Sequence, residues 1–170
     1  MKAHNEMDTH APGGRPAGES QNRSSARTRG DEIYGAIDLG TNNCRMLMAK
    51  RAHRGFRVVE SFSRIVKLGE GLGASGSLSQ AAMDRAVEAL SICAQKLERR
   101  RVTKLRAVAT QACRMADNGP AFLERVRQET GLSLDLISPE EEARLAVQGS
   151  LDLLDDSFDA AVVVDIGGGS

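Results

Sequence analysis

Three adjacent carboxylates are the first residues in this chain whose type and spacing could do chemistry. The stretch ISPEEEARLAVQG places Glu140, Glu141 and Glu142 at the start of a predicted helix. Ser138 suits an N-cap, a proline follows it at the first helical position, and Glu141 stands at the spacing of a capping box. Negative charge in a first turn is also stabilised by the helix dipole. Glu140 and Glu141 therefore have structural roles available, and Glu142 is the carboxylate left over.

Two short segments, YGAIDLGTN and VVVDIGGGS, repeat one pattern of residues that suits phosphate and metal. Each has an apolar strand, an aspartate (Asp38 or Asp165), an apolar residue, a glycine and then small residues. Such a turn exposes consecutive backbone N–H groups to phosphate oxygens, and glycine lets the backbone approach closely. The aspartate can hold a divalent metal directly or through water. One such loop alone is better explained as a hairpin turn, but two in matching positions favour a phosphate site.

The elements that must position these loops begin after a polar segment. Residues 1–31 are rich in Gly, Pro, Ser and Arg, which predicts a disordered tail, and we expect no ligand role for His4 or His10 within it. Three strand-length segments, IYGAIDLG, CRMLMAKR and GFRVVESFS, follow as an antiparallel meander. A glycine-rich loop, KLGEGLGASGSLS, leads to a helix that begins near Ser79.

The second half of the chain alternates helices and strands. The helix after Ser79 carries an apolar stripe with helical spacing: Met83, Val87, Leu90, Ala94 and Leu97. KLRAVAT is strand-like, a helix opens at NGP and stops at Gly131, and LSLDLIS alternates as a strand. The glutamate helix comes next, and AAVVVDIGGGS reads as a buried strand that runs into glycines. The predicted order is β-β-β-α-β-α-β-α followed by one further strand.

Composition excludes several classes of function. The 170 residues contain 23 basic and 23 acidic side chains, so no global basic field favours nucleic acid. Aromatic residues make up 3% of the chain, which counts against base-stacking platforms. Cys44, Cys93 and Cys113 lack zinc or disulfide spacing and predict buried, reduced thiols in a cytoplasmic protein. No segment approaches the roughly 18 apolar residues of a membrane span, so neither membrane nor specific nucleic acid is expected as a partner.

The two loops, with RAVATQACRMADN and ISPEEEARLAVQG between them in this order and spacing, resemble the exopolyphosphatase / guanosine pentaphosphate phosphatase (Ppx/GppA) family. That family belongs to the acetate kinase, sugar kinase, Hsp70 and actin superfamily. The resemblance covers about residues 34–170, everything but the tail. It implies an α/β fold, an actin-like (ribonuclease H-like) βββαβαβα subdomain with a mixed sheet over 32–157. Residues 158–170 would start a second subdomain that is otherwise missing, so we expect an N-terminal fragment with little turnover of its own.

The resemblance also implies roles for individual residues. Glu142 matches the family's catalytic Glu, which orients or deprotonates the water that attacks the terminal phosphorus. Arg114 matches an Arg that grips phosphate oxygens, a use that suits its planar, permanently charged fork. Asp38 and Asp165 match the acids of the phosphate loops, and Asp165 is the better match for a Mg²⁺ contact. The implied phosphate-binding residues are Gly40, Thr41, Asn42, Asn43, Gly167, Gly168, Gly169 and Ser170. The first loop departs from the family pattern at Asn43, where Ser is frequent, and at Cys44, where a bulky residue is frequent.

By the same resemblance, the chain is part of a cytoplasmic, Mg²⁺-dependent phosphohydrolase. Its substrate would be inorganic polyphosphate or guanosine pentaphosphate, and the full-length protein would pair into homodimers. Two alternatives stay open. A kinase of the superfamily would carry its nucleotide-binding elements in the missing half, although the EEEAR segment argues against it. A non-catalytic phosphate- or nucleotide-binding module is the other, against which the presence of Glu142 and Arg114 argues. The sequence does not choose between the two substrates.

Overall fold

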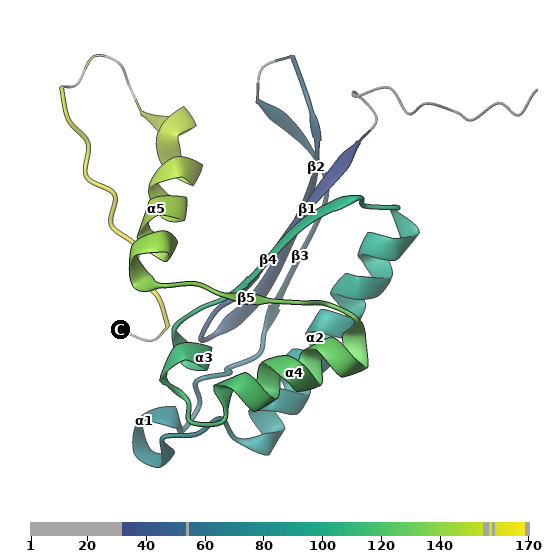
Figure 1. Ribbon diagram of the computed structural model, residues 1–170. Coiled ribbons are helices and arrows are strands. Elements are labelled where there is room, and N and C mark those ends of the chain that lie inside the picture. Colours follow the sequence, from purple (N-terminus) through teal and green to yellow (C-terminus); the bar gives the residue numbers. More distant parts are fainter. Residues whose placement is uncertain (1–31, 54, 155–156, 158, 169–170) are drawn as a thin grey trace, which may run out of the picture.

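The computed structural model describes residues 32–53, 55–154, 157 and 159–168 (Figure 1). The predicted disordered tail and the last two predicted phosphate-binding residues, Gly169 and Ser170, lie outside this range. The elements in chain order are β1 (Ile33–Leu39), β2 (Asn43–Arg51), β3 (Phe56–Ile65), α1 (Leu72–Ser75), α2 (Gln80–Arg99), β4 (Lys104–Ala109), α3 (Gln111–Met115), α4 (Gly119–Thr130), β5 (Asp135–Leu136), α5 (Pro139–Ser150) and the 3-10 turn η1 (Leu151–Leu153).

The predicted order of strands and long helices is confirmed as far as α5. Two short helices are additional: α1 lies within the glycine-rich loop, and α3 lies in the QACR segment. β5 is confined to Asp135–Leu136 within the longer predicted strand LSLDLIS. Helices of four or five residues hold too little of an apolar stripe to be recognised from sequence periodicity.

The five strands form one mixed sheet in the order β3-β2-β1-β4-β5. β1 pairs antiparallel with β2 and parallel with β4, and β4 pairs parallel with β5. Leu39 at the end of β1 lies opposite both Ala109 at the end of β4 and Cys44 near the start of β2. The loops that follow β1 and β4 therefore emerge at the same edge of the sheet, as they must if they share one site.

The core lies between one face of the sheet and the pair α2 and α4 (Figure 1). Alternate residues of β1 and β2, such as Ile37 and Met46, point into it, because side chains of a strand alternate between faces. The predicted stripe of α2 faces the same core: Val87, Leu90 and Leu97 are buried, and Met83 and Ala94 are partly buried against it. The prediction of an amphipathic helix is confirmed.

All three cysteines are buried and unbridged, as predicted. Cys44 and Cys93 lie in the core between β2 and α2, and Cys113 lies in α3. Burial raises the pKa of the Cys113 thiol to about 12, so this thiol stays protonated at neutral pH. These side chains pack as small apolar residues. No helix within the described ranges is long and apolar enough to span a membrane.

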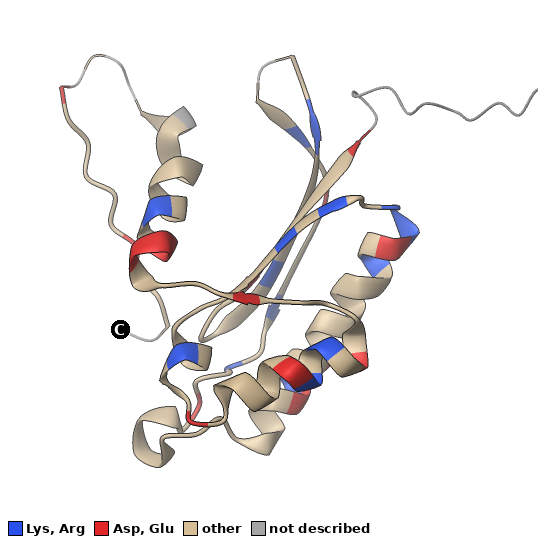
Figure 2. Ribbon diagram, in the orientation of Figure 1, with Lys and Arg blue, Asp and Glu red and all other residues tan. Residues whose placement is uncertain are grey.

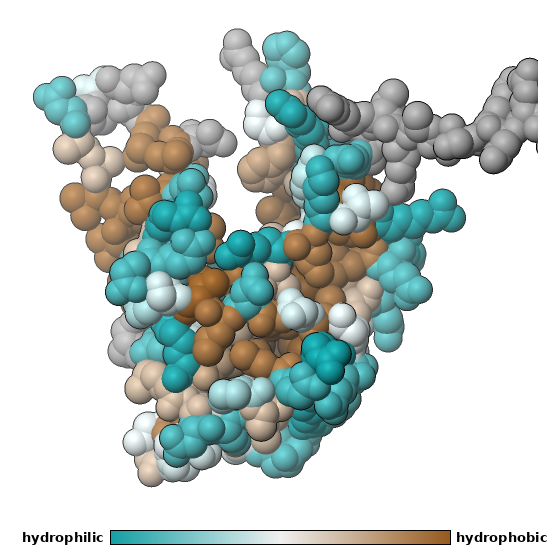
Figure 3. Space-filling view, viewed as in Figure 1, coloured by the Kyte–Doolittle hydropathy of each residue, from teal (hydrophilic) through white to brown (hydrophobic). Residues whose placement is uncertain are grey.

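The last part of the chain differs from the prediction. Residues 160–166, predicted as a buried strand, have no regular secondary structure, and Val162, Val164 and Ile166 are 88%, 75% and 84% exposed. A strand needs a neighbour that pairs with its backbone N–H and C=O groups, and no strand in the described part of the chain pairs with this segment. α5 likewise has no buried residue. Figure 3 shows apolar surface over α5 and the segment after it.

Candidate functional site

The loop after β1 is held in a tight turn by its own backbone and by the chain after β3. The Gly40 N–H donates to the Asn43 carbonyl at 2.9 Å. The Asn42 carbonyl accepts from the Val66 and Lys67 N–H groups at 2.9 and 3.0 Å. The carbonyl oxygens of the loop thus bind to neighbouring backbone, and the loop shape is anchored before any ligand arrives.

A close approach between backbones completes the loop. The Gly69 N–H donates to the Thr41 carbonyl at 3.0 Å, and a Cβ at Gly69 would collide with the Thr41 Cγ2 methyl. Only glycine fits at this position without moving Thr41. The predicted glycine-rich loop therefore supports the turn after β1, through the contact between Gly69 and Thr41.

The second predicted loop lies directly against the first. A Cβ added at Gly168 would stand 2.8 Å from the Asn42 Cβ, so the two backbones approach as closely as glycine allows. Asp165, three residues earlier, lines the same cavity as the first loop. Gly169 and Ser170, predicted with this group, lie outside the described residues.

The three glutamates of α5 have three different environments. Ser138 caps the helix, and its hydroxyl oxygen accepts from the Glu141 N–H at 3.3 Å. A hydrogen bond with Ser138 lowers the pKa of Glu140, and hydrogen bonds from Arg144 at 2.7 and 2.8 Å lower the pKa of Glu141. Glu140 therefore interacts with the N-cap residue, and Glu141 forms an ion pair with Arg144 on the surface of the helix. Glu142 has neither partner, as the capping pattern predicted.

Glu142 is joined to Arg114, so the structure brings two predicted catalytic residues into direct contact. Both Nη1 and Nη2 of Arg114 donate to Glu142 Oε2 at 3.0 Å. Nη1 also donates to the Ile137 carbonyl at 2.7 Å. The Arg114 and Glu142 side chains are 20% and 34% exposed, so the pair is partly shielded from solvent. Figure 2 shows the acidic first turn of α5 above the basic position on α3.

One cavity of about 360 Å³ collects most of the predicted site. The predicted residues that line it are Asp38, Gly40, Thr41, Asn42, Asn43, Glu142, Asp165, Gly167 and Gly168. Arg114 is not among the lining residues, because its guanidinium is turned to Glu142 and Ile137. Residues more than 120 positions apart in the chain therefore meet at one edge of the sheet.

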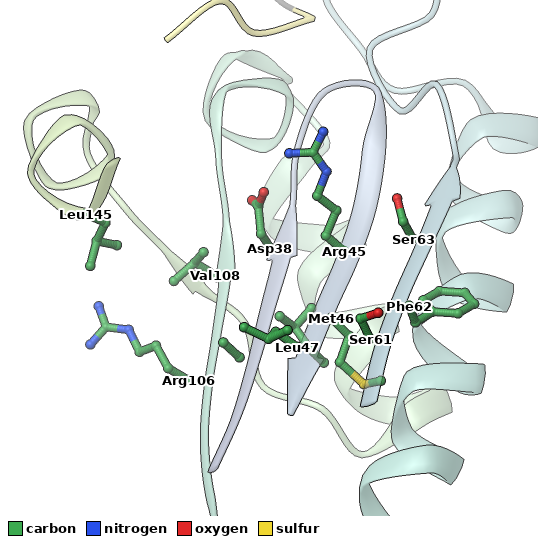
Figure 4. A pocket seen from close by; sticks show the side chains of 12 residues that line it. Asp38, Arg45, Met46, Leu47, Ser61, Phe62, Ser63, Arg106, Val108 and Leu145 are labelled. Carbon is green, nitrogen blue, oxygen red and sulfur yellow. The ribbon is translucent and has the colours of Figure 1, made fainter. Parts of the chain in front are cut away.

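Arg45, Thr110, Gln111 and Ile166 also line this cavity and were not predicted. Arg45 is the important addition, since it pairs with Asp38 across β1 and β2. Figure 4 shows the Arg45 guanidinium and the Asp38 carboxylate pointing toward the same end of their strands. A neighbouring cavity of about 530 Å³ continues from these two residues toward Arg106. Only the strand register could have placed Arg45 beside Asp38.

The charged side chains that line the cavity, among the described residues, are three carboxylates (Asp38, Glu142 and Asp165) and one guanidinium (Arg45). Burial raises the pKa of Asp38, Arg45 opposes this effect, and the nearby charges of Glu142 and Asp165 add to it. Within the described ranges, no group of three or more His, Cys, Asp or Glu side chains has the arrangement of a metal site. Mg²⁺, however, is commonly bound by one or two carboxylates together with water and substrate phosphates. Asp38 and Asp165 fit that smaller donor set.

Known proteins resemble this chain over most of its length. The sequence profile of the Ppx/GppA phosphatase family matches residues 47–170. A solved structure of the Aquifex aeolicus Ppx/GppA family member has 29% identity and a TM-score of 0.67, covering 70% of this chain and 39% of that one. An exopolyphosphatase from Cytophaga hutchinsonii has 27% identity and a TM-score of 0.66, covering 71% of this chain and 39% of that one.

A third solved structure has the same fold as this chain. An exopolyphosphatase-like protein superimposes with a TM-score of 0.69 at 27% identity, covering 74% of this chain and 38% of that one. The mixed sheet with its helices is thus the actin-like α/β fold of these structures. The chain spans about two-fifths of the length of these solved structures.

Proposed function

Because the chain belongs to the Ppx/GppA phosphatase family, we propose that it forms part of the active site of a phosphohydrolase acting on terminal phosphoanhydride bonds. The substrate class is inorganic polyphosphate or guanosine pentaphosphate. The observation that supports this most directly is the convergence of the first loop, Glu142 and Asp165 on one cavity. Phosphoryl transfer depends mainly on positioning and charge neutralisation, and this cavity offers groups for both.

The two loops are the proposed phosphate-binding elements. Backbone N–H groups of residues 41–43, next to the Gly40 N–H that already donates to the Asn43 carbonyl, and of the segment at Gly167 would donate to the oxygens of the terminal phosphate. The turn is already held by hydrogen bonds to the chain after β3, so binding requires little reordering. The close approach of Gly168 to Asn42 keeps the two loops within reach of one phosphate group.

Glu142 is the proposed base. Its Oε2 is held by Arg114, and Oε1 accepts no hydrogen bond from any residue that the structure describes. A carboxylate with one free oxygen can orient a water and accept a proton as the water attacks phosphorus. The water oxygen then joins the released phosphate, the bond from phosphorus to the bridging oxygen breaks, and the proton passes to Glu142.

Mg²⁺ is the proposed metal, held by Asp38 and Asp165. Burial is the main cause that raises the pKa of Asp38, the charges of Glu142 and Asp165 add to it, and a bound cation would favour the charged carboxylate. When bound, the ion would neutralise charge on the phosphate oxygens. The contribution of the chain itself is to hold the phosphate at the loops and the water at Glu142.

The test is phosphate release in the presence of Mg²⁺ from long-chain polyphosphate and from guanosine pentaphosphate. The assay uses this chain with the reading frame continued past Ser170 wherever it extends. Glu142→Gln should reduce release by at least about 100-fold, since general-base catalysis contributes that order. Glu140→Gln is the matched control on the same turn and should stay within about twofold of wild type, since Glu140 does not line the cavity.

Two results would remove the proposal. A folded protein that releases no phosphate from either substrate would not be a phosphohydrolase of this kind. Transfer of phosphate to an acceptor, in place of release to water, would assign it to the kinases of the superfamily. Equal activity of Glu142→Gln and wild type would leave the hydrolase intact but remove Glu142 as its base.

A further inference from the structure

The chain after β3 binds the first phosphate loop through a turn that contains one strained residue. The Val66 and Lys67 N–H groups donate to the Asn42 carbonyl at 2.9 and 3.0 Å, and the Gly69 N–H donates to the Thr41 carbonyl at 3.0 Å. Lys67, where the chain turns between these contacts, has a φ of 47°. This left-handed region is unfavourable for a residue with a Cβ, and such a conformation persists only where surrounding contacts enforce it.

Arg85 of α2 makes contacts that enforce this conformation. Its Nε donates to the Val66 carbonyl at 2.8 Å, and its Nη2 donates to the Lys67 carbonyl at 3.3 Å. These carbonyls belong to the two peptide units that flank the Lys67 Cα, so binding both of them restricts φ and ψ of Lys67. Glu70 Oε2 accepts a further hydrogen bond from Nη2 at 2.8 Å, which keeps the guanidinium in place.

The turn at Lys67 bears on phosphate binding because it fixes a peptide unit of the first loop. The C=O of Asn42 and the N–H of Asn43 belong to one planar peptide and point in opposite directions. Because the Asn42 carbonyl is bound to the chain after β3, the Asn43 N–H points away from that chain. Both residues line the cavity. A released peptide could turn its carbonyl to the cavity, where the partial negative charge of the oxygen would repel phosphate.

We propose that Arg85 is a positioning residue of the first phosphate loop, which holds the strained turn at Lys67 and, through it, the peptide between Asn42 and Asn43. Arg85 does not line the cavity, so its effect on phosphate passes through the backbone. The ligand is that of the proposed function, on which the phosphate-binding part of this assignment rests. The state of the turn is independent of any ligand and can be measured without one.

Amide hydrogen exchange, followed by NMR, and tripolyphosphate binding test the role of Arg85 in the protein with the reading frame continued past Ser170 wherever it extends. In Arg85→Gln, the Val66 and Lys67 amides should exchange at least about tenfold faster, because their turn is no longer held. Calorimetry should show tripolyphosphate binding weakened about tenfold, the scale of one lost charge-assisted hydrogen bond. KM for phosphate release should rise more than kcat falls, since Glu142 on α5 is not displaced.

Variants of Lys67 separate the strain at this residue from its charge. Glycine adopts the left-handed conformation without a steric cost, so Arg85→Gln should weaken tripolyphosphate binding by less than about threefold in the Lys67→Gly background. Lys67→Gln removes the ammonium and keeps the Cβ, so Arg85→Gln should still weaken binding about tenfold there. An equal effect of Arg85→Gln in all three backgrounds would show that Arg85 does not hold the strained turn, and would overturn the proposal.

Two further variants separate positioning from a general loss of stability. Arg125→Gln removes an arginine of α4 that does not line the cavity and pairs at 2.8 Å with Asp84, the residue before Arg85. It should lower the melting temperature and leave amide exchange in the turn and tripolyphosphate binding within about twofold of wild type. Arg85→Lys can reach one of the two carbonyls, so it should recover part of the binding, and it keeps the test decisive if Arg85→Gln does not fold.

The exchange and binding results distinguish the role of Arg85 from the proposed function. Unchanged exchange of the Val66 and Lys67 amides in Arg85→Gln would overturn the proposal. An equal loss of binding in Arg125→Gln would also overturn it, because the effect would then follow stability and not the loop. If the wild-type protein neither binds tripolyphosphate nor releases phosphate, the proposed function fails, and the exchange rates still decide whether Arg85 holds the turn.

Discussion

Gly69→Ala tests the contact that shapes the first phosphate loop. The new Cβ would overlap the Thr41 Cγ2 methyl while standing 3.7 Å from the Thr41 Cβ. The backbone cannot easily withdraw, because the Gly69 N–H donates to the Thr41 carbonyl at 3.0 Å. Thr41 must therefore turn about χ1 or the loop must shift. Overpacking costs about 1–3 kcal/mol and an off-rotamer side chain about 0.5–1.5, so we expect a loss of about 1–2 kcal/mol.

The assay is urea unfolding of four proteins: wild type, Gly69→Ala, Thr41→Ser and the double variant. Serine keeps the hydroxyl of Thr41 and lacks the methyl that collides, so Gly69→Ala should cost less than about 0.5 kcal/mol in the Thr41→Ser background. The resulting coupling of about 1 kcal/mol is the size found between side chains in contact. Gly73→Ala is the matched control, because a Cβ there meets nothing within 4 Å. We expect no loss of stability from it.

Tripolyphosphate binding should follow the same pattern. Gly69→Ala should weaken binding, because it displaces the loop, and Thr41→Ser should restore it. An equal cost of Gly69→Ala in both backgrounds would show that Thr41 is not the residue it displaces. A variant as stable as wild type would show that the loop and the chain after β3 are not as close as the structure places them.

Three further predictions concern the scaffold. Hydrogen bonds from Lys96 of α2 and from Arg100, the residue that follows this helix, lower the pKa of Glu60 to about 2. The contribution of Glu60 to stability is therefore present above pH 4.5 and is lost as the pH falls toward 2. Glu60→Gln should therefore lower the urea midpoint at pH 7 and match wild type near pH 2. Gly119→Ala places a Cβ against the Cys113 carbonyl, which is backbone and cannot turn away. We expect the free energy of unfolding to fall by about 3 kcal/mol, or the variant not to fold, and circular dichroism would detect either result. Phe122 is 1% exposed. Phe122→Ala should lower the free energy of unfolding in urea by about 3–5 kcal/mol, and Phe122→Leu should lower it much less.

Local chemistry made much of this fold predictable. The Ser138 cap, the apolar stripe of α2 and the stop at Gly131 depend on residues within one or two turns of each other, and all three are present. The two Asp-x-Gly loops were predictable for the same reason. The turn after β1 is set by neighbouring residues, whereas the strand expected before the second loop is absent; phosphate binding by both loops stays a prediction.

Contacts between distant residues were not predictable in the same way. Arg45 lies beside Asp38 because of the strand register, and the short helix α3 aims Arg114 at Glu142, 28 positions away in the chain. The strand predicted over 160–166 is absent because apolar sequence creates only a tendency to pair, and pairing needs a neighbour.

By itself, the sequence determined which residues could bind phosphate, cap α5 and fill the core, because these properties follow from residue type and local spacing. The tertiary structure decided that Arg114 holds Glu142 and that Arg45 lines the cavity beside Asp38. That choice depends on distances of about 3 Å between side chains from different elements, and local spacing does not encode such distances.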